Sequence, residues 1–200
     1  MDPLVEGYRR FRAEVWPAER ARYEALANWG QSPDTMIIAC SDSRVDPQTI
    51  FGAVPGEMFV LRNVAALVPP YQPDGGGFHG SSAAIEFGVR VLKVARIVVL
   101  GHAQCGGVKA MAVGAPPQAG DFVAAWVDIG RPALTANGGN AQSLDEVEAG
   151  VVRLSLANLM TFPWVADAVA AGKLTVQGFR LDIHTGVLSR VLADSVEPVD

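Results

Sequence analysis

The chain has 200 residues but only two cysteines and three histidines. Two thiols cannot make a disulfide framework, so the fold must be held by a hydrophobic core, which a chain of this length can bury. No apolar run approaches the about 20 residues that a membrane-spanning helix requires. Positive charge is not in excess either: the net charge is -5 and the pI is about 5.2, which argues against a nucleic-acid partner.

The N-terminal segment lacks the pattern of a secretory signal. Acidic residues begin at Asp2, and no apolar core precedes a cleavage site of small residues. We therefore expect a soluble, cytoplasmic protein with no membrane partner. In that reducing compartment, two cysteines more often bind a metal or act as catalytic thiols than form a disulfide.

Short apolar runs alternate with helical periodicity along the chain. The runs predict β-strands at 35–40, 58–62, 96–100 and 174–179. Helices are predicted at 4–29 with an interruption at Pro17, at 81–94 and at 144–160. Such alternation predicts an α/β fold, a mostly parallel β-sheet flanked by helices.

No segment divides the chain into independent domains. Loop-like composition is confined to residues 69–80, 114–120 and 131–142. We predict a single domain over 1–200, with an N-terminal helical arm (1–30) and an α/β core (31–186). Apolar residues at helical spacing form one stripe on the arm, and this stripe needs a surface to pack on. Its members are Leu4, Tyr8, Phe11 and Val15.

Three potential metal ligands follow two of the predicted strands. Cys40 ends the run MIIAC, and His102 and Cys105 come directly after IVVLG. In a parallel sheet the carboxyl ends of the strands lie at one edge, so the three side chains converge there if the two strands are neighbours. Two cysteines and one histidine with an open fourth position are typical of a catalytic zinc site.

Other interpretations of these residues remain open. Each cysteine could be a small buried apolar residue, and the pair could be a redox dithiol, although no C-x-x-C is present. Asp42 and Arg44 beside Cys40 favour metal binding, because packing alone gives no reason for them. His79 and His184 are expected to be hydrogen-bonded surface or packing residues. The segment 75–82 (GGGFHGSS) lacks the lysine of a phosphate-binding loop and is expected to be a flexible loop.

Three motifs together are familiar. CSDSR (40–44), RNVA (62–65) and GHAQCGG (101–107) resemble the β-class carbonic anhydrases, and the similarity runs from about Gly30 to Gly186. The resemblance implies reversible hydration of carbon dioxide to bicarbonate and a proton. It also implies one zinc ion per subunit, held by Cys40, His102 and Cys105. The active form would be a homo-oligomer, a dimer or a dimer of dimers, in which the N-terminal helices pack on a partner subunit.

Asp42 and Arg44 are the predicted catalytic residues. Asp42 is placed to accept a hydrogen bond from zinc-bound water, and Arg44 can hold this carboxylate with a bidentate ion pair. In the closed state known in the family, the aspartate itself takes the fourth position on the metal. The alternative is an ordinary surface ion pair.

The resemblance also implies a pocket for the substrate. Its expected residues are Phe59, Val64 and Phe87 as apolar walls, Gln31 as a hydrogen-bond donor, and Gly106 through its backbone N–H. From sequence alone, Phe59 and Val64 could equally be core residues, and Gln31 an ordinary loop residue.

The chain departs from the family pattern at three positions. Phe87 replaces a tyrosine of many plant-type members, and Ala66 replaces an asparagine. Ile37 stands where the bicarbonate-regulated subgroup has tryptophan, which favours the plant-type subgroup. Two other functions are compatible with the sequence: hydrolysis of carbon disulfide or carbonyl sulfide, and zinc binding without catalysis.

Overall fold

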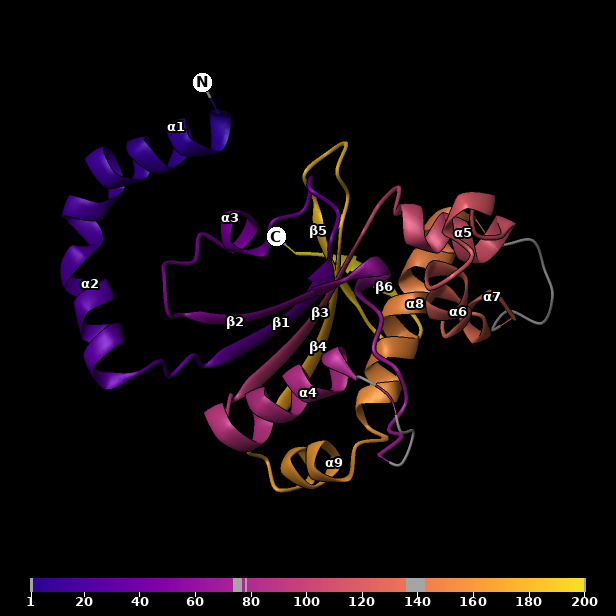
Figure 1. Ribbon diagram of the computed structural model, residues 1–200. Coiled ribbons are helices and arrows are strands. Elements are labelled where there is room, and N and C mark those ends of the chain that lie inside the picture. Colours follow the sequence, from indigo (N-terminus) through magenta and orange to yellow (C-terminus); the bar gives the residue numbers. More distant parts are fainter. Residues whose placement is uncertain (1, 74–76, 78, 136–142, 200) are drawn as a thin grey trace.

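The strands form one six-stranded sheet in the order β2-β1-β3-β4-β5-β6 (Figure 1). This computed structural model describes residues 2–73, 77, 79–135 and 143–199. The strands are β1 (Thr35–Cys40), β2 (Met58–Asn63), β3 (Arg96–His102), β4 (Thr175–Leu181), β5 (Leu188–Val191) and β6 (Val196–Pro198). The first four are parallel, and β5 and β6 are added antiparallel. The predicted mostly parallel α/β fold is confirmed.

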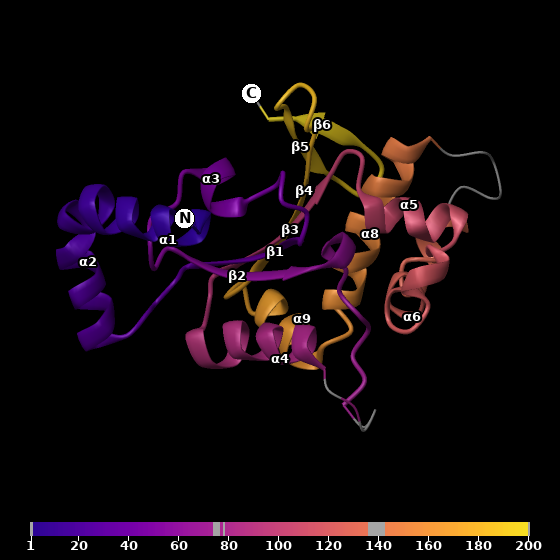
Figure 2. The same ribbon diagram turned by 45° about the horizontal axis from the view of Figure 1, so that its top comes forward.

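Helices connect the strands and cover the sheet. They are α1 (Pro3–Arg10), α2 (Trp16–Trp29), α3 (Pro47–Phe51), α4 (Gly80–Glu86), α5 (Gly106–Val113), α6 (Val123–Asp128), α7 (Pro132–Thr135), α8 (Leu144–Leu159) and α9 (Pro163–Ala170). Figures 1 and 2 show α4, α8 and α9 on one face of the sheet and α3 on the other. Among the described residues no single helix is long and apolar enough to span a membrane; α8 and α9 meet that criterion only as a pair bent by 89°.

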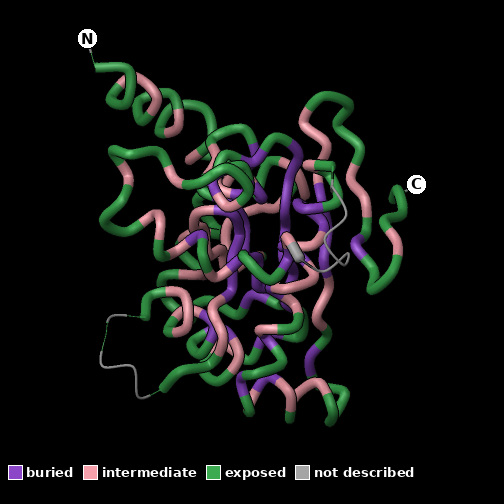
Figure 3. Tube along the Cα trace, turned by 90° about the vertical axis from the view of Figure 1, so that its right-hand side faces the viewer, coloured by how far each residue is buried: buried purple, intermediate pink, exposed green. Residues whose placement is uncertain are grey.

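The central strands carry apolar residues on both faces. Met36 and Ile38 of β1 belong to the larger core cluster under α4, α8 and α9. Ile37 and Ala39 point to the opposite face, where the core is smaller and α3 contributes to it. This is the period-2 alternation of a strand that is buried on both sides. Figure 3 shows the buried residues gathered along these strands.

Helix α8 can lie close to the sheet because two strand positions, Gly101 and Gly178, have no side chain. A Cβ at Gly178 would lie 2.6 Å from Cγ1 of Val152 and 2.9 Å from Cδ1 of Leu156. A Cβ at Gly101 would lie 2.6 Å from Cγ2 of Val152. A β-branched valine cannot rotate away easily, so any larger residue would push the helix outward. The close approach brings the side chains of α8 to the carboxyl ends of β3 and β4.

The N-terminal arm stands away from the rest of the chain (Figures 1 and 2). None of residues 3–29, all of which the structure describes, is buried, and Leu4 is 82% exposed. The predicted interruption at Pro17 takes the form of a π-helical segment, Phe11–Val15, directly before α2. Proline has no N–H to donate to the preceding turn, which explains a widened turn there. Three of the four stripe residues, Leu4, Tyr8 and Val15, are therefore exposed in the single chain, while Phe11 is half-buried against Trp16 and Tyr23 of the arm itself.

Several predicted boundaries changed in the structure. Strand β3 extends through Gly101 and His102, and the helix predicted at 81–94 is α4 followed by a π-helical segment, Phe87–Leu92. The loop predicted at 131–142 begins with α7, while its residues 136–142 lie outside the described part of the chain. The loop predicted at 75–82 is wrong at its end, because Gly80, Ser81 and Ser82 begin α4. Residues 74–76 and 78 of the predicted loops 69–80 and 75–82 lie outside the described part of the chain. The single domain over 1–200 stays a prediction.

Candidate metal centre

The three predicted metal ligands meet at the carboxyl ends of β1 and β3. The two strands are parallel neighbours, with Ala39 beside Leu100, so Cys40 lies next to the end of β3. The Sγ atoms of Cys40 and Cys105 are 3.9 Å apart, and they lie with a ring nitrogen of His102 within 4.8 Å of one another. All three residues are at least 95% buried. The predicted convergence is confirmed.

The spacing of these donor atoms fits a zinc ion. Two sulfur atoms bound to one tetrahedral zinc, each at about 2.3 Å, lie about 3.8 Å apart, which matches the observed distance. Nδ1 of His102 is 2.8 Å from the carbonyl oxygen of Ala103, and donation to that oxygen leaves the Nε2 lone pair free. Among the described residues, His102 Nε2 is the one buried side-chain nitrogen or oxygen without a hydrogen-bond partner. A metal ion bound to this nitrogen would supply the missing partner.

The two cysteine side chains are hydrogen-bonded to each other through their Sγ atoms. The hydrogen bond with Cys105 is the main cause that lowers the pKa of Cys40, and the same bond, together with burial, raises the pKa of Cys105. Two neighbouring thiolates repel each other in a buried site. A divalent cation removes this conflict because it stabilises both negative charges at once.

Asp42 and Arg44 form a tight ion pair at the mouth of the ligand cluster. Arg44 donates from Nε to Oδ1 at 2.9 Å and from Nη2 to Oδ2 at 2.7 Å. This pairing holds the pKa of Asp42 well below its usual range. Oδ2 of Asp42 lies 3.9 Å from His102 Nε2, so the carboxylate is beside the metal position while both of its oxygens are engaged by Arg44.

An arginine that the sequence reasoning did not assign holds the loop after β1. Arg62 donates to the carbonyl oxygens of Cys40, Asp42 and Val45 at 3.0, 2.7 and 3.2 Å. A guanidinium can satisfy several carbonyl groups of one turn because its donors have a fixed geometry. The sequence does contain a signal for this role: Arg62 is a charged residue at the end of an apolar strand, in the motif RNVA.

Two of the predicted pocket residues lie beside the ligands. Val64 follows β2 directly and packs against the apolar cluster that contains Cys40 and Cys105. Its Cγ1 atom would lie 2.8 Å from a Cβ at Gly107, so it is close to the start of α5. Gly106 is the first residue of α5, immediately after Cys105. Both can therefore line a pocket at this centre.

The other three predicted pocket residues are not near the ligands in a single chain. Phe59 pairs with Met36, four positions before Cys40, which places it about 13 Å along the strand at 3.3 Å per residue. Phe87 lies against Phe59, with ring centroids 5.8 Å apart. Gln31 precedes the start of β1, at the opposite end of that strand from Cys40. A pocket built by all five residues within one chain is therefore excluded.

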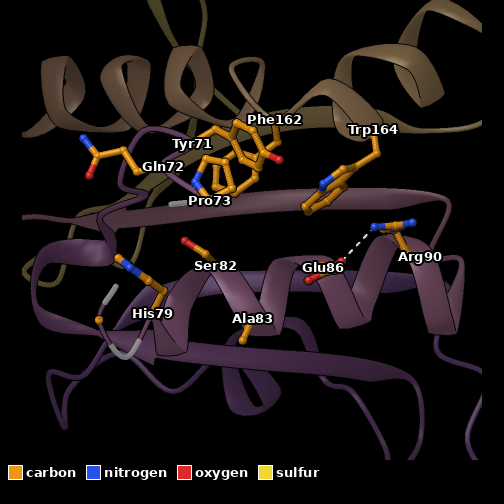
Figure 4. A pocket seen from close by; sticks show the side chains of 11 residues that line it. Tyr71, Gln72, Pro73, His79, Ser82, Ala83, Glu86, Arg90, Phe162 and Trp164 are labelled. Carbon is orange, nitrogen blue, oxygen red and sulfur yellow. Dashed lines mark hydrogen bonds and ion pairs between the residues drawn. The ribbon is translucent and has the colours of Figure 1, made fainter. Parts of the chain in front are cut away.

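The remaining histidines lie elsewhere. His184 is exposed, and its backbone N–H donates to Asp182. His79 lines a hollow of about 380 Å³ between α4 and the segment that leads into α9, where it faces Tyr71 and Pro73 (Figure 4). Among the described residues, none of the three predicted metal ligands lines this hollow.

Known proteins that are similar to this chain are carbonic anhydrases, which agrees with a metal centre at Cys40, His102 and Cys105. The carbonic anhydrase family model matches residues 35–188. A carbonic anhydrase of Pseudomonas aeruginosa is 38% identical over 191 residues, covering 93% of this chain and 85% of the relative. The chloroplastic β carbonic anhydrase 5 of Arabidopsis thaliana is 33% identical over 184 residues, covering 88% of this chain and 60% of the relative.

Solved structures give the same result. The β-carbonic anhydrase CcaA superimposes with a TM-score of 0.88 at 29% identity, covering 98% of both chains. A Coccomyxa β-carbonic anhydrase, solved in complex with acetazolamide, gives 0.81 at 28% identity, covering 99% of this chain and 87% of that one. With the family match over residues 35–188 and the Cys–His–Cys cluster, these likenesses show that the chain belongs to the carbonic anhydrase family, in its β class.

Proposed function

We propose that the chain catalyses the zinc-dependent, reversible hydration of carbon dioxide to bicarbonate and a proton. The observation that carries this proposal is the donor set of Cys40, His102 and Cys105, whose two sulfur atoms have the spacing expected on a tetrahedral zinc and whose three donors would leave a fourth coordination position open. Catalytic zinc sites keep such a position, whereas structural sites close it with a fourth protein ligand. One zinc ion per chain is expected.

The chain's own residues would prepare the reaction around that ion. Zinc supplies a Lewis acid that makes water nucleophilic near neutral pH. Asp42 stays ionised because Arg44 lowers its pKa, so it can accept a hydrogen bond from the reacting water and orient it. Val64 and Ala65 give the centre apolar surroundings, which suits an apolar substrate such as carbon dioxide. Gly106 is the first residue of α5, where a backbone N–H has no partner within the helix, so it can donate to an oxygen of bicarbonate.

Stopped-flow hydration of carbon dioxide, on protein of measured zinc content, tests the function. The rate is expected to scale with bound zinc, to vanish after chelation and to return when zinc is added back. Stoichiometric zinc without hydration would instead indicate a non-catalytic zinc protein. Release of hydrogen sulfide from carbon disulfide or carbonyl sulfide, at a rate far above hydration, would indicate the sulfur-analogue hydrolase.

We also assign the chain to the plant-type subgroup. Ile37 is 1% exposed and packs with Ala39, Val98 and Leu100, so this position offers no polar group for a second bicarbonate. The pairing of both Asp42 oxygens with Arg44 supports a carboxylate held off the metal.

Bicarbonate is therefore expected not to switch the enzyme off. Hydration rates measured against bicarbonate at slightly acidic pH should fall along a simple hyperbola, as product inhibition at one site requires. Sigmoidal loss of activity would contradict the subgroup assignment.

The active form is proposed to be a homodimer or a dimer of dimers. Its support is the uncovered arm and the position of Phe59, Phe87 and Gln31, which can line a metal pocket only if a second copy brings them there. Sedimentation equilibrium should give at least twice the chain mass of 21.1 kDa. A fully active monomer would contradict this. A cytoplasmic location is also proposed, because both ligand thiols are free and must stay reduced.

A further inference from the structure

A buried ion pair lies directly behind the metal ligands and is not part of the site described above. Glu148 of α8 is 2% exposed, and Oε2 accepts from Arg180 of β4, with Nε at 2.9 Å and Nη2 at 2.7 Å. The same Nη2 also contacts Asp145 at 2.6 Å. Asp145 and Glu148 share one face of α8 because they are three residues apart. The other oxygen of Glu148, Oε1, accepts from the backbone N–H of Cys105 at 3.3 Å.

Such a pair is not explained by stability. Removing two charges from water costs desolvation energy that their attraction often fails to recover, and apolar residues of similar size are frequently at least as stable. Two apolar residues at positions 148 and 180 could not accept a hydrogen bond from the Cys105 N–H, whereas Glu148 does. Arg180 holds Oε2 of Glu148, and Oε1 of the same carboxylate then faces the segment His102–Cys105, which we call the ligand loop.

The ligand loop needs outside support. Gln104, between His102 and Cys105, has φ of 56°, a conformation that non-glycine residues adopt only when their surroundings enforce it. Three hydrogen bonds enforce it: Ala103 N–H to Leu181 O at 2.8 Å, Arg44 Nη2 to Gln104 O at 3.2 Å, and Cys105 N–H to Glu148. Cys105 is also the N-cap of α5, and its Sγ atom lies with the donor atoms of Cys40 and His102 and makes no cap hydrogen bond.

We propose that Glu148, oriented by Arg180, is a positioning residue of the metal centre. It holds the backbone of Cys105, and thereby fixes where the thiolate meets the metal. The inference rests on the proposed function, because it assumes that zinc binds to Cys40, His102 and Cys105. Its effect is expected first on metal affinity and coordination geometry, and only through these on turnover.

The double variant Glu148→Leu/Arg180→Leu tests this directly. It removes the acceptor for Cys105 without leaving an unpaired buried charge, so the metal-free protein is expected to unfold near the parental temperature. Zinc affinity, measured by competition with a chelator, should fall about 10- to 100-fold, the loss usual when support for a ligand is removed. The thiolate-to-metal absorption of the cobalt-substituted protein should shift as well. Glu146→Gln is the matched control: it lies on the same helix, keeps the N-terminal capping box and should bind zinc like the parent.

Parental zinc affinity in the double variant would overturn the inference while leaving the proposed function intact. A parent protein that binds no zinc would overturn both. If the double variant does not fold, the zinc affinity of the single variant Glu148→Gln tests the inference instead. It keeps the shape, its amide oxygen pairs with Arg180, and its NH₂ group then faces the Cys105 N–H, donor against donor. An affinity loss of about tenfold is expected in this variant, and parental affinity there would overturn the inference.

Discussion

Replacing His102 with alanine is expected to reduce bound zinc from about one ion per chain to background, and carbon dioxide hydration with it. His102 supplies one of three donors, and its Nε2 atom has no other partner among the described residues. Two thiolates alone give the metal too few ligands to compete with solvent. The loss should therefore exceed the about 100-fold that removal of a supporting contact causes. Zinc analysis of freshly purified, reductant-treated protein measures it.

The other two histidines provide matched controls. His79 and His184 are exposed, so His79→Ala and His184→Ala should keep full zinc and full activity. Cys40→Ser should behave like His102→Ala, because a hydroxyl remains protonated where a thiol ionises on the metal. Stoichiometric zinc in His102→Ala, with the same cobalt spectrum as the parent, would show that the metal binds elsewhere.

The ligands could be predicted from the sequence because each follows an apolar run that ends in polar residues. MIIAC and IVVLGH are short and β-rich, and parallel neighbours bring such ends together. The same reasoning could not find Glu148 or Arg180. They are 32 positions apart, on a helix and a strand, and their contact depends on how closely α8 approaches Gly101 and Gly178. That distance follows from tertiary packing, which periodicity does not encode.

Two other features were also beyond sequence reasoning. Strands β5 and β6 are only four and three residues long, too short for alternation to reveal them. The pocket was predicted as one set of residues, yet Phe59 lies near the start of β2, whose other end, at Asn63, pairs with the predicted metal ligand Cys40. A motif records which residues are needed for a function, but not whether a single chain brings them together.

Asp42→Asn is expected to keep zinc but to lower the hydration rate at least about 100-fold. Asp42 is not one of the three ligands, so metal analysis should give the parental value. An asparagine has the same shape, but its amide carries no charge, and the NH₂ group cannot accept a hydrogen bond. The reacting water would therefore lose the acceptor that orients it. Stopped-flow rates at equal zinc content separate this loss from a loss of metal.

The neighbouring Asp46 gives the matched control for Asp42→Asn. Asp46 accepts from the backbone N–H of Thr49 at 3.0 Å and caps α3. Asparagine caps helices as well as aspartate does. Asp46 also lies 3.6 Å from Nη1 of Arg62, but Arg62 holds the loop after β1 through Nε and Nη2, so Asp46→Asn should keep both zinc and rate. If the pair of Asp42 and Arg44 were only a surface ion pair, Asp42→Asn would match this control. Equal rates in the two variants would therefore show that Asp42 has no role in the reaction. A much lower rate in Asp42→Asn than in Asp46→Asn, at equal zinc content, would support its role in orienting the reacting water.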